Sequence, residues 1–201
     1  MTTPTTLDGE VRGTAIRSIT DAIDDACGFF EGRTREHLAA HGLADASGQA
    51  WYDVGECVAV YDDLLETTGR HTVRRIGKEL AHRFAFDRDV DSFEEALTAL
   101  DDAYRHLHRG DVGGYRFEST GAESGRLVCR TPYPEVLEEG LLRGLAQRFT
   151  DTGYVTTDLV TTEQRDGLRV TTLDVEWWNG TAIARAEPDE AIATAGPADA
   201  D

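Results

Sequence analysis

Apolar residues recur every three or four positions through the first half of the chain, which is the spacing of one face of an α-helix. Ile16, Ile19, Ile23 and Ala26 follow this spacing and predict a helix over residues 13–30. The same spacing predicts further helices, at 34–41, from 53 to about 69, around Val73, Ile76, Leu80 and Phe84, and from 93 to about 108.

Two of these predicted helices begin with the sequence of a capping box, in which a Ser or Asp is followed three residues later by Glu. The first box runs from Asp53 to Glu56 and the second from Ser92 to Glu95. The helix after the first box is expected to bury Val54, Val58, Tyr61 and Leu65.

The apolar pattern changes near residue 110 to the alternation that is typical of strands. Strands are expected at 115–119, 126–131, 154–163 and 168–178, with a tight turn inside each pair. Between the pairs, Pro134 suits the first turn of a helix, with Leu137, Leu141, Leu145 and Phe149 on its apolar side. This order predicts an α+β fold, in which an N-terminal layer of about five helices packs on hairpin–helix–hairpin, forming a four-stranded antiparallel sheet.

Small and large residues near the C-terminal half indicate how these elements pack. Gly140 and Gly144 lie one helical turn apart and are expected to let another element approach the helix closely. Trp177 and Trp178 end the last strand, where one side chain should face the core and the other the outside. We interpret the outward-facing Trp as an aromatic side chain that covers the edge of the sheet. The alternative is that it belongs to a protein–protein interface.

The 201 residues suit one compact domain, with hydrophobic residues at 40% of the chain. We expect a flexible N-terminus at 1–10, a single α+β ligand-binding-like domain at 11–178 and a disordered acidic tail at 179–201. No apolar stretch approaches the roughly 20 residues that span a bilayer, and the first residues do not resemble a signal peptide. The sequence therefore predicts a cytoplasmic protein that binds no membrane.

The charge composition indicates which partners and which salt environment the protein has. The chain has 38 acidic and 20 basic residues, a net charge of −18, and 19 of the basic residues are Arg. Such acidity excludes a general nucleic-acid binder, which needs a basic footprint. An acidic surface almost without Lys is typical of extreme halophiles, where molar salt screens the self-repulsion. An Arg preference from a GC-rich genome is the alternative.

Cysteine and histidine spacing does not predict a metal centre. Cys27, Cys57 and Cys129 are far apart and are expected to be reduced. His37 and His41 share a helical face but lack the Glu of a zinc protease, and we interpret them as surface residues. His106 and His108 are weak candidate metal ligands, provided that the preceding helix has already ended.

Three stretches resemble a known family. They are Val11-Arg-Gly-Thr-Ala-Ile-Arg-Ser-Ile19, Trp51-Tyr-Asp-Val followed by a helix and Val73-Arg-Arg-Ile-Gly-Lys-Glu-Leu80, and Pro134-Glu-Val-Leu-Glu-Glu-Gly-Leu-Leu-Arg-Gly144 between two hairpins. In this order they resemble the haem nitric-oxide/oxygen-binding (H-NOX) domain and its haem-free relatives. Those relatives include the 4-vinyl reductase domains and the ligand-binding fold shared with TRAPP tethering subunits.

The resemblance also bears on haem. Haem members carry Tyr-x-Ser-x-Arg after the second strand of the first hairpin, where it grips the haem propionates. The matching stretch here is Cys129-Arg-Thr-Pro-Tyr133, so Cys129, Thr131 and Tyr133 stand in the three positions and the Arg is lost. A carboxylate loses its bidentate partner in that exchange. His106 or His108 would lie near the family's haem-ligand helix, but we expect no haem and no other cofactor.

The sequence predicts a cleft between helices and sheet, lined by aromatic and polar residues. The candidate ligand-binding residues are Tyr104, His108, Tyr115, Cys129, Thr131 and Tyr133. A lowered pKa would make Cys129 reactive, although alternation favours an inert strand cysteine. No motif for a catalytic triad, a phosphate loop or a dinucleotide site is present, and no catalytic residue is assigned.

Three functions remain open. The one we favour is a haem-free sensory domain that binds a small apolar ligand, forms a homodimer and signals through a separate partner. The second is an enzyme or accessory factor of tetrapyrrole or pigment metabolism, which would need polar groups converging around Cys129 or His106. The third is a structural protein–protein interaction module, which would need an apolar surface near Trp177 or the helix of Gly140 and Gly144.

Overall fold

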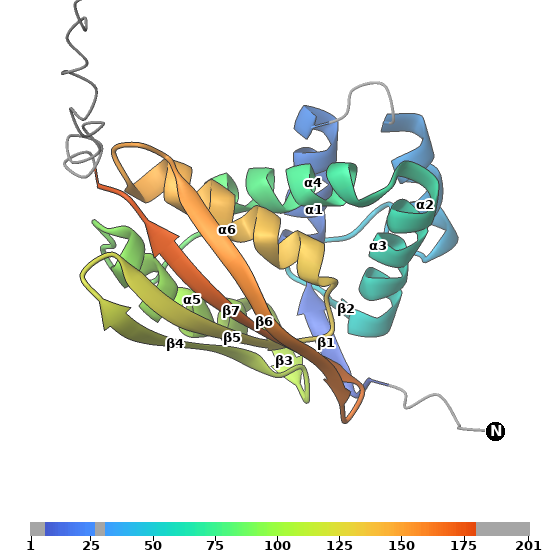
Figure 1. Ribbon diagram of the computed structural model, residues 1–201. Coiled ribbons are helices and arrows are strands. Elements are labelled where there is room, and N and C mark those ends of the chain that lie inside the picture. The colour runs from blue at the N-terminus through green and yellow to red at the C-terminus, as the bar shows by residue number, and fades with distance from the viewer. Residues whose placement is uncertain (1–6, 27–30, 180–201) are drawn as a thin grey trace, which may run out of the picture.

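The computed structural model describes residues 7–26 and 31–179 and has the predicted α+β architecture (Figure 1). Six helices occupy this part of the chain: α1 (Gly13–Ala26), α2 (Glu31–Ala40), α3 (Val54–Thr68), α4 (Arg70–Arg83), α5 (Phe93–Leu107) and α6 (Glu135–Phe149). Seven strands accompany them: β1 (Gly9–Arg12), β2 (Trp51–Asp53), β3 (His108–Gly110), β4 (Gly114–Gly121), β5 (Ser124–Thr131), β6 (Val155–Arg165) and β7 (Leu168–Trp177).

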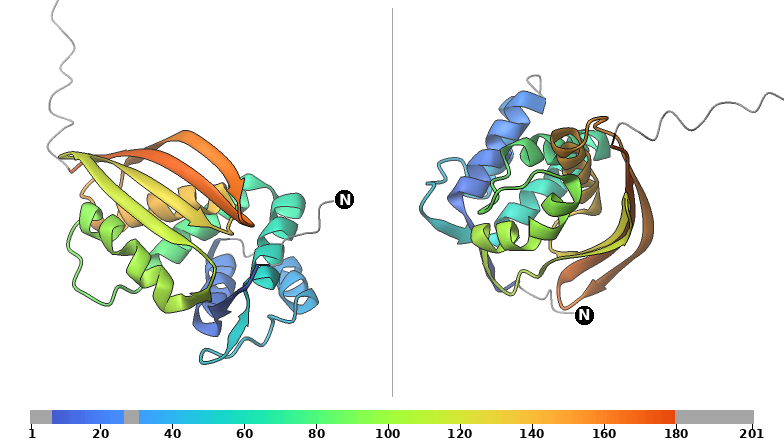
Figure 2. Two further views of the ribbon diagram at one scale, coloured as in Figure 1. Left: turned by 90° about the horizontal axis from the view of Figure 1, so that it is seen from below. Right: turned by 90° about the vertical axis from the view of Figure 1, so that its left-hand side faces the viewer.

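The four long strands form one antiparallel sheet in the order β4-β5-β7-β6. The two predicted hairpins therefore lie side by side, joined through β5 and β7, and β5 pairs with β7 along its full length from Ser124 to Thr131. The turn between β6 and β7 places Asp166 and Gly167 at positive φ, as a tight hairpin turn requires. The sheet curves over α5 and α6, and the remaining helices lie beyond these two (Figure 2).

A second, smaller sheet was not expected from the sequence. It joins three short strands in the order β2-β1-β3, with Val11 paired to both Tyr52 and His108. Gly9 and Glu10 therefore belong to a strand, which corrects the expectation of a loose N-terminus through residue 10. Strands of three or four residues carry too few side chains for alternation to reveal them.

The helix starts agree with their predicted caps. The Asp53 carboxylate accepts hydrogen bonds from the backbone N–H groups of Gly55 and Glu56, and the Ser92 hydroxyl accepts one from Glu95. Each bond satisfies a donor that the first helical turn leaves without a partner inside the helix.

The buried face of α3 differs from the expected one. Val54 and Tyr61 are buried as predicted, whereas Val58 and Leu65 are only partly buried. The remaining buried positions of the helix are Cys57, Val60 and Leu64. The true apolar face is thus rotated by about one residue, because α3 packs on α2, α4 and β1 from different sides.

Helices α4 and α6 pack closely through glycines, as the spacing in α6 predicted. A Cβ atom on Gly140 would lie 2.1 Å from the Arg74 carbonyl oxygen, and one on Gly144 would lie 2.3 Å from that of Lys78. Gly77 on α4 faces the Leu137 carbonyl in the same way. Only residues without a side chain allow the two backbones to approach this far.

The interior consists of two groups of buried side chains. One joins α1, α3 and α4 with Tyr104 and Tyr133, and the other joins α5, α6 and the sheet around Trp177. Trp177 is buried against Phe93 and Phe117, while Trp178 is half-buried beside Tyr154, which confirms the expected division between the two rings.

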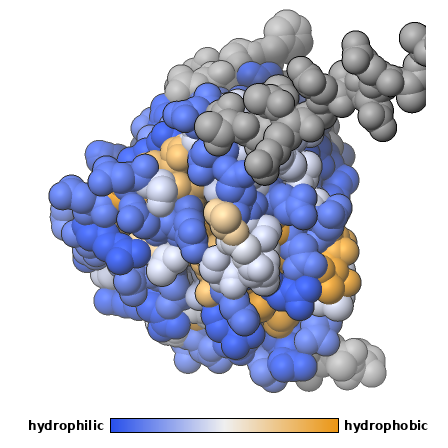
Figure 3. Space-filling view, turned by 60° about the vertical axis from the view of Figure 1, so that its left-hand side comes forward, coloured by the Kyte–Doolittle hydropathy of each residue, from blue (hydrophilic) through white to orange (hydrophobic). Residues whose placement is uncertain are grey.

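The exposed surface in Figure 3 is mostly hydrophilic. Large apolar side chains that are exposed in the described ranges gather on and beside β6, namely Tyr154, Leu159 and Val160. Neither Trp177 nor the glycine face of α6 is exposed, so the surface that an interaction module was expected to use lies inside the protein. No helix within 7–26 or 31–179 is long and apolar enough to cross a bilayer.

Candidate functional site

A cavity of about 360 Å³ lies between the two groups of buried side chains. Its wall combines residues of α1, α3, α4, α5 and α6 with residues of the sheet. Apolar walls come from Ala15, Ile19, Leu80, Ala103 and Leu141, among others. This volume falls within the range of small-molecule pockets, which are concave, mostly apolar and carry a few placed polar groups.

His108 is the first polar group of this wall. It stands where α5 ends and β3 begins, and only 9% of it is exposed. Its Nδ1 atom lies 2.9 Å from the Tyr104 carbonyl oxygen and its Nε2 atom lies 2.7 Å from the Tyr133 hydroxyl. Because a carbonyl oxygen only accepts, Nδ1 carries the proton, and Nε2 accepts from Tyr133.

The surroundings hold His108 in the neutral form. Burial lowers its pKa to about 4, although the hydrogen bond to the Tyr104 carbonyl acts in the opposite direction. The Tyr104 ring is stacked on the imidazole, with ring centres 3.9 Å apart. Cys57 completes the group, since its thiol is hydrogen-bonded to the Tyr133 oxygen and burial raises its pKa to about 12.

Glu138 is the second polar group. It lies on α6, and 3% of it is exposed. The Thr131 hydroxyl donates to Oε1 and the Tyr115 hydroxyl donates to Oε2, both at 2.7 Å. Burial raises the pKa of Glu138 to about 7, and the two hydrogen bonds reduce the rise.

Four tyrosines line the cavity between these groups, namely Tyr61, Tyr104, Tyr115 and Tyr133. Their rings meet edge to face, with interplanar angles of 85° to 88° for the pairs Tyr104–Tyr115, Tyr61–Tyr133 and Tyr104–Tyr133. Edge-to-face packing is a favourable arrangement of aromatic rings.

The sequence located this site in part. Tyr104, His108, Tyr115 and Tyr133 all line the cavity, as does His106 at the end of α5. The two other candidates, Thr131 and Cys129, do not belong to the wall, each for a different reason.

Thr131 acts through another residue, because its hydroxyl donates to Glu138. Cys129 is buried among apolar side chains of α5, α6 and the sheet. Burial raises the pKa of this thiol well above its usual range, which contradicts a reactive cysteine. The polar groups of the cavity converge on His108 and Glu138 instead.

Glu138 was missed, although the sequence carries a signal for it. The residue lies one turn before Leu141 and Leu142 and two turns before Leu145, all three buried. An acidic residue in the apolar stripe of a helix is rarely buried unless it has a task or a partner. Its bond to Tyr115 joins residues 23 positions apart, which spacing alone does not predict.

Charged residues surround one side of the cavity. Arg12, Arg83, Asp87 and His106 contribute to the wall there. The Arg12 guanidinium lies over the Trp51 ring and one of its NH groups is 3.4 Å from His106 Nε2. Its Nε atom is buried without a hydrogen bond.

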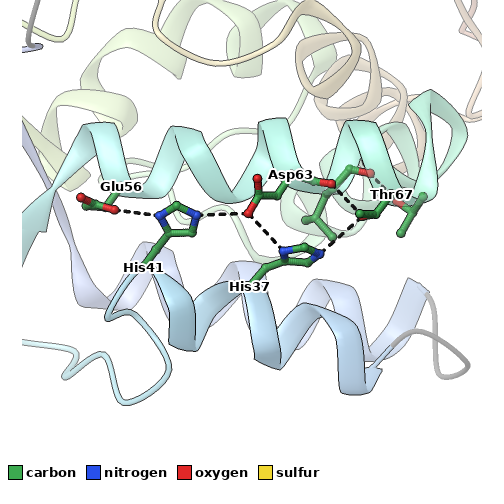
Figure 4. Close-up of polar contacts among 7 residues, drawn as sticks. His37, His41, Glu56, Asp63 and Thr67 are labelled. Atoms are coloured by element: carbon green, nitrogen blue, oxygen red, sulfur yellow. Dashed lines mark hydrogen bonds and ion pairs between the residues drawn. The ribbon is translucent and has the colours of Figure 1, made fainter.

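His37 and His41 lie away from this cavity and connect α2 to α3 (Figure 4). Both rings approach the same Asp63 oxygen, at 3.1 and 3.2 Å, and His41 Nδ1 lies 2.8 Å from Glu56. The hydrogen bond to Glu56 raises the pKa of His41, with Asp63 acting in the same direction. They are thus half-buried and paired rather than free surface residues.

Within the described ranges, no group of three or more His, Cys, Asp or Glu side chains is arranged to hold a metal ion. His37 and His41 join the end of α2 to α3 through their hydrogen bonds to Asp63 and Glu56. His106 and His108 point to different partners, Arg12 for the first and Tyr133 for the second.

No family model matches the sequence, and no curated protein matches it either. Solved structures do. An oxygen-binding H-NOX domain related to soluble guanylate cyclases, in its oxygen complex, is 14% identical, with a TM-score of 0.63 over 84% of this chain and 95% of that one.

Two further structures give the same result. A point mutant of the T. tengcongensis H-NOX protein is 14% identical, with a TM-score of 0.64 over 84% of this chain and 98% of that one. A mutant of Cs H-NOX with 4-cyano-L-phenylalanine at one site is 15% identical, with a TM-score of 0.64 over 84% of this chain and 97% of that one. The chain described here has an H-NOX-like fold.

Proposed function

We propose that this protein is a haem-free sensory domain that binds a small, largely apolar molecule in the cavity between its helices and its sheet. The observation that carries the proposal is the partly open cavity of about 360 Å³, whose mostly apolar wall includes the buried side chains of His108 and Glu138. Residues of α1, α4, α5 and α6 contribute to the wall. A ligand there would contact most layers of the fold at once, as a domain that reports occupancy requires.

The cavity residues do not fit haem, the group named for several H-NOX structures. An axial ligand needs a free imidazole nitrogen, and both nitrogens of His108 are engaged, one by Tyr104 and one by Tyr133. The other imidazole of the wall, His106, has its Nε2 atom 3.4 Å from Arg12 and its Nδ1 atom 3.7 Å from Asp87. The propionates need cationic or neutral donors. Of the residues in the family's propionate-binding positions, Thr131 and Tyr133 already donate elsewhere, and Thr131 is bonded to the Glu138 carboxylate. The arginines of the wall, Arg12 and Arg83, belong to the side that also carries Asp87 and His106.

The absorption spectrum of the protein in molar KCl, as purified and after one equivalent of haemin, tests the absence of haem. We expect no sharp, saturable Soret band. A saturable band that is lost when either His106 or His108 is replaced by Ala would refute this part of the proposal.

Thermal melting with a panel of small apolar molecules tests the cavity itself. Binding to the folded state alone raises the melting temperature by mass action. Ala15→Phe places a ring against the cavity from the partly buried face of α1 and should abolish the stabilisation. Ala39→Phe makes the same change on the exposed side of α2 and should leave it intact. Equal stabilisation of both variants would contradict the proposed site.

The remaining expectations concern the setting of the domain. A cytoplasmic location, molar-salt adaptation, a homodimer and a separate signalling partner all agree with an acidic protein of this fold. Light scattering in molar KCl tests the dimer, and twice the mass of 22.0 kDa is the expected value.

A further inference from the structure

The Glu138 carboxylate has no cationic partner among the residues that the structure describes. Its two hydrogen bonds come from neutral hydroxyls, those of Thr131 and Tyr115. Arg169 is the cation whose charge acts on it, but that guanidinium donates to the Tyr133 carbonyl and pairs with Glu135. A buried carboxylate without a counter-charge is costly, so the site leaves a place for a positive charge.

The hydrogen-bonding capacity of the carboxylate points the same way. Two oxygens offer about four lone-pair positions, and only two donors use them here. Glu138 belongs to the cavity wall, so a donor inside the cavity can reach the remaining positions. The Tyr61 hydroxyl offers a further oxygen, since that side chain lines the cavity, is 1% exposed and has no hydrogen bond in the described ranges.

The aromatic walls favour the same charge. The rings of Tyr61, Tyr104, Tyr115 and Tyr133 lie close to perpendicular to their neighbours around the cavity. A cation over the face of an aromatic ring is attracted by the negative charge of the π system, and such cages recognise ammonium groups. An anion bound beside Glu138 would be repelled by its carboxylate, and the arginines of the wall, Arg12 and Arg83, belong to the side that also carries Asp87 and His106.

We propose that the cavity selects small organic ammonium ions, with the charged head paired to Glu138 inside the tyrosine cage and the apolar body against α1 and α4. The inference rests on the proposed small-molecule site and names the class of its ligand. The volume limits the body to one ring or a short chain, of the size of benzylammonium.

Burial raises the pKa of Glu138 to about 7, so this carboxyl changes charge near neutral pH. The same wall also contains Arg12, Arg83, Asp87 and His106. Burial raises the pKa of Tyr61, Tyr104 and Tyr115 well above their usual range, so they stay protonated. His108 stays neutral because its pKa is lowered to about 4. On the remaining elements around Glu138, the pKa values of Cys129 and Tyr133 are raised, so both stay protonated, and the charge of Arg169 lowers the pKa of Glu138.

Three probes of one shape separate charge from shape: benzylammonium, benzyl alcohol and benzoate. Calorimetric titration at pH 8 should give benzylammonium at least about tenfold tighter binding than the alcohol, the usual gain from a charge-assisted hydrogen bond. Benzoate should bind more weakly than the alcohol. Between pH 5 and 8 the affinity for benzylammonium should rise about tenfold or more as Glu138 ionises, while that for the alcohol does not rise.

The matched variants are Glu138→Gln and Glu139→Gln, the same change on neighbouring positions of α6. Glu139 pairs with Arg74 outside the cavity wall. Glu138→Gln should remove the preference for benzylammonium and keep binding of the alcohol, while Glu139→Gln should keep both. If Glu138→Gln does not fold, the pH profile of the unmodified protein decides alone.

The outcomes distinguish the two proposals. Alcohol binding that Ala15→Phe abolishes, together with benzylammonium no tighter than the alcohol, overturns charge selection and leaves the cavity function standing. No cavity-dependent binding of any of the three probes overturns charge selection, and the same result across the apolar panel overturns the proposed function as well.

Discussion

Replacing Glu138 by Gln should make the protein progressively more stable, relative to the unmodified chain, as the pH rises from 4.5 to 8. Folding moves the carboxyl from water, where its pKa is 4.5, into a site where burial raises the pKa to about 7. The folded state then holds a proton that the unfolded state has released. Stability from this group is therefore full below pH 4.5 and is lost as the pH rises through about 7.

The size of the effect follows from the two pKa values. A difference of about 2.5 units corresponds to about 3 kcal/mol, at about 1.4 kcal/mol per unit. The residue is 3% exposed, so solvent screening does not reduce this figure much. Gln keeps the shape and hydrogen-bonding ability of the side chain and carries no charge at any pH. The advantage of the variant should thus grow by about 3 kcal/mol across the window.

Urea denaturation in molar KCl at pH 4.5 and 8 measures this change. At each pH, the free energy of unfolding of the unmodified protein is subtracted from that of the variant, so contributions from groups that titrate alike in both proteins cancel. Glu139→Gln, with its carboxylate paired to Arg74 on the outside of α6, should not show the growing advantage. A constant difference between Glu138→Gln and the unmodified protein at the two pH values would refute the assignment of a desolvated carboxylate.

Three further predictions concern other parts of the molecule. The melting temperature should rise between 0.1 and 2 M KCl, since salt screens the net charge of −18, and equal melting in both would contradict molar-salt adaptation. The paired His41 should stabilise the folded state fully below its unfolded pKa of 6.5, and this stabilisation should be lost as the pH rises through the higher folded pKa. His41→Gln should therefore lower the urea midpoint at pH 5.5 more than at pH 8.5. His82→Gln, on the exposed side of α4, is the matched control and should not show this difference. Gly140→Ala should lower the free energy of unfolding by at least about 1–3 kcal/mol, the cost of overpacking, because the added Cβ would lie 2.1 Å from the Arg74 carbonyl oxygen; an unchanged urea midpoint would mean that α4 and α6 are further apart.

Much of the local structure could be predicted. Asp53 and Ser92 accept the expected cap bonds because capping depends only on neighbouring backbone atoms. The two hairpins follow from alternation and a tight turn, which are also local. The apolar face of α3 was predicted one residue out of place, since a helix that contacts several elements is not buried on a single regular stripe.

The cavity could be predicted only in part. Tyr104 and Tyr133 were expected at a cleft because the helix–sheet boundary and aromatic side chains are visible in the sequence. Cys129 was placed there by alignment of a hairpin end, yet its side chain turns to the apolar side of the sheet. The burial of Glu138 could not be predicted because one of its partners, Tyr115, comes from β4, 23 residues away, and only the folded sheet brings that strand to α6.

The order of elements, the helix starts, the acidic composition and the glycines that allow α4 and α6 to approach follow from the sequence. Each of these depends on backbone geometry or composition over a few neighbouring residues. The chemistry of the interior depends instead on how the elements pack. The neutral form of His108, the raised pKa of Glu138 and the inert state of Cys129 all result from burial and from partners distant in the chain. Desolvation depends on what surrounds a group in space, and that is fixed only when the helices close over the sheet.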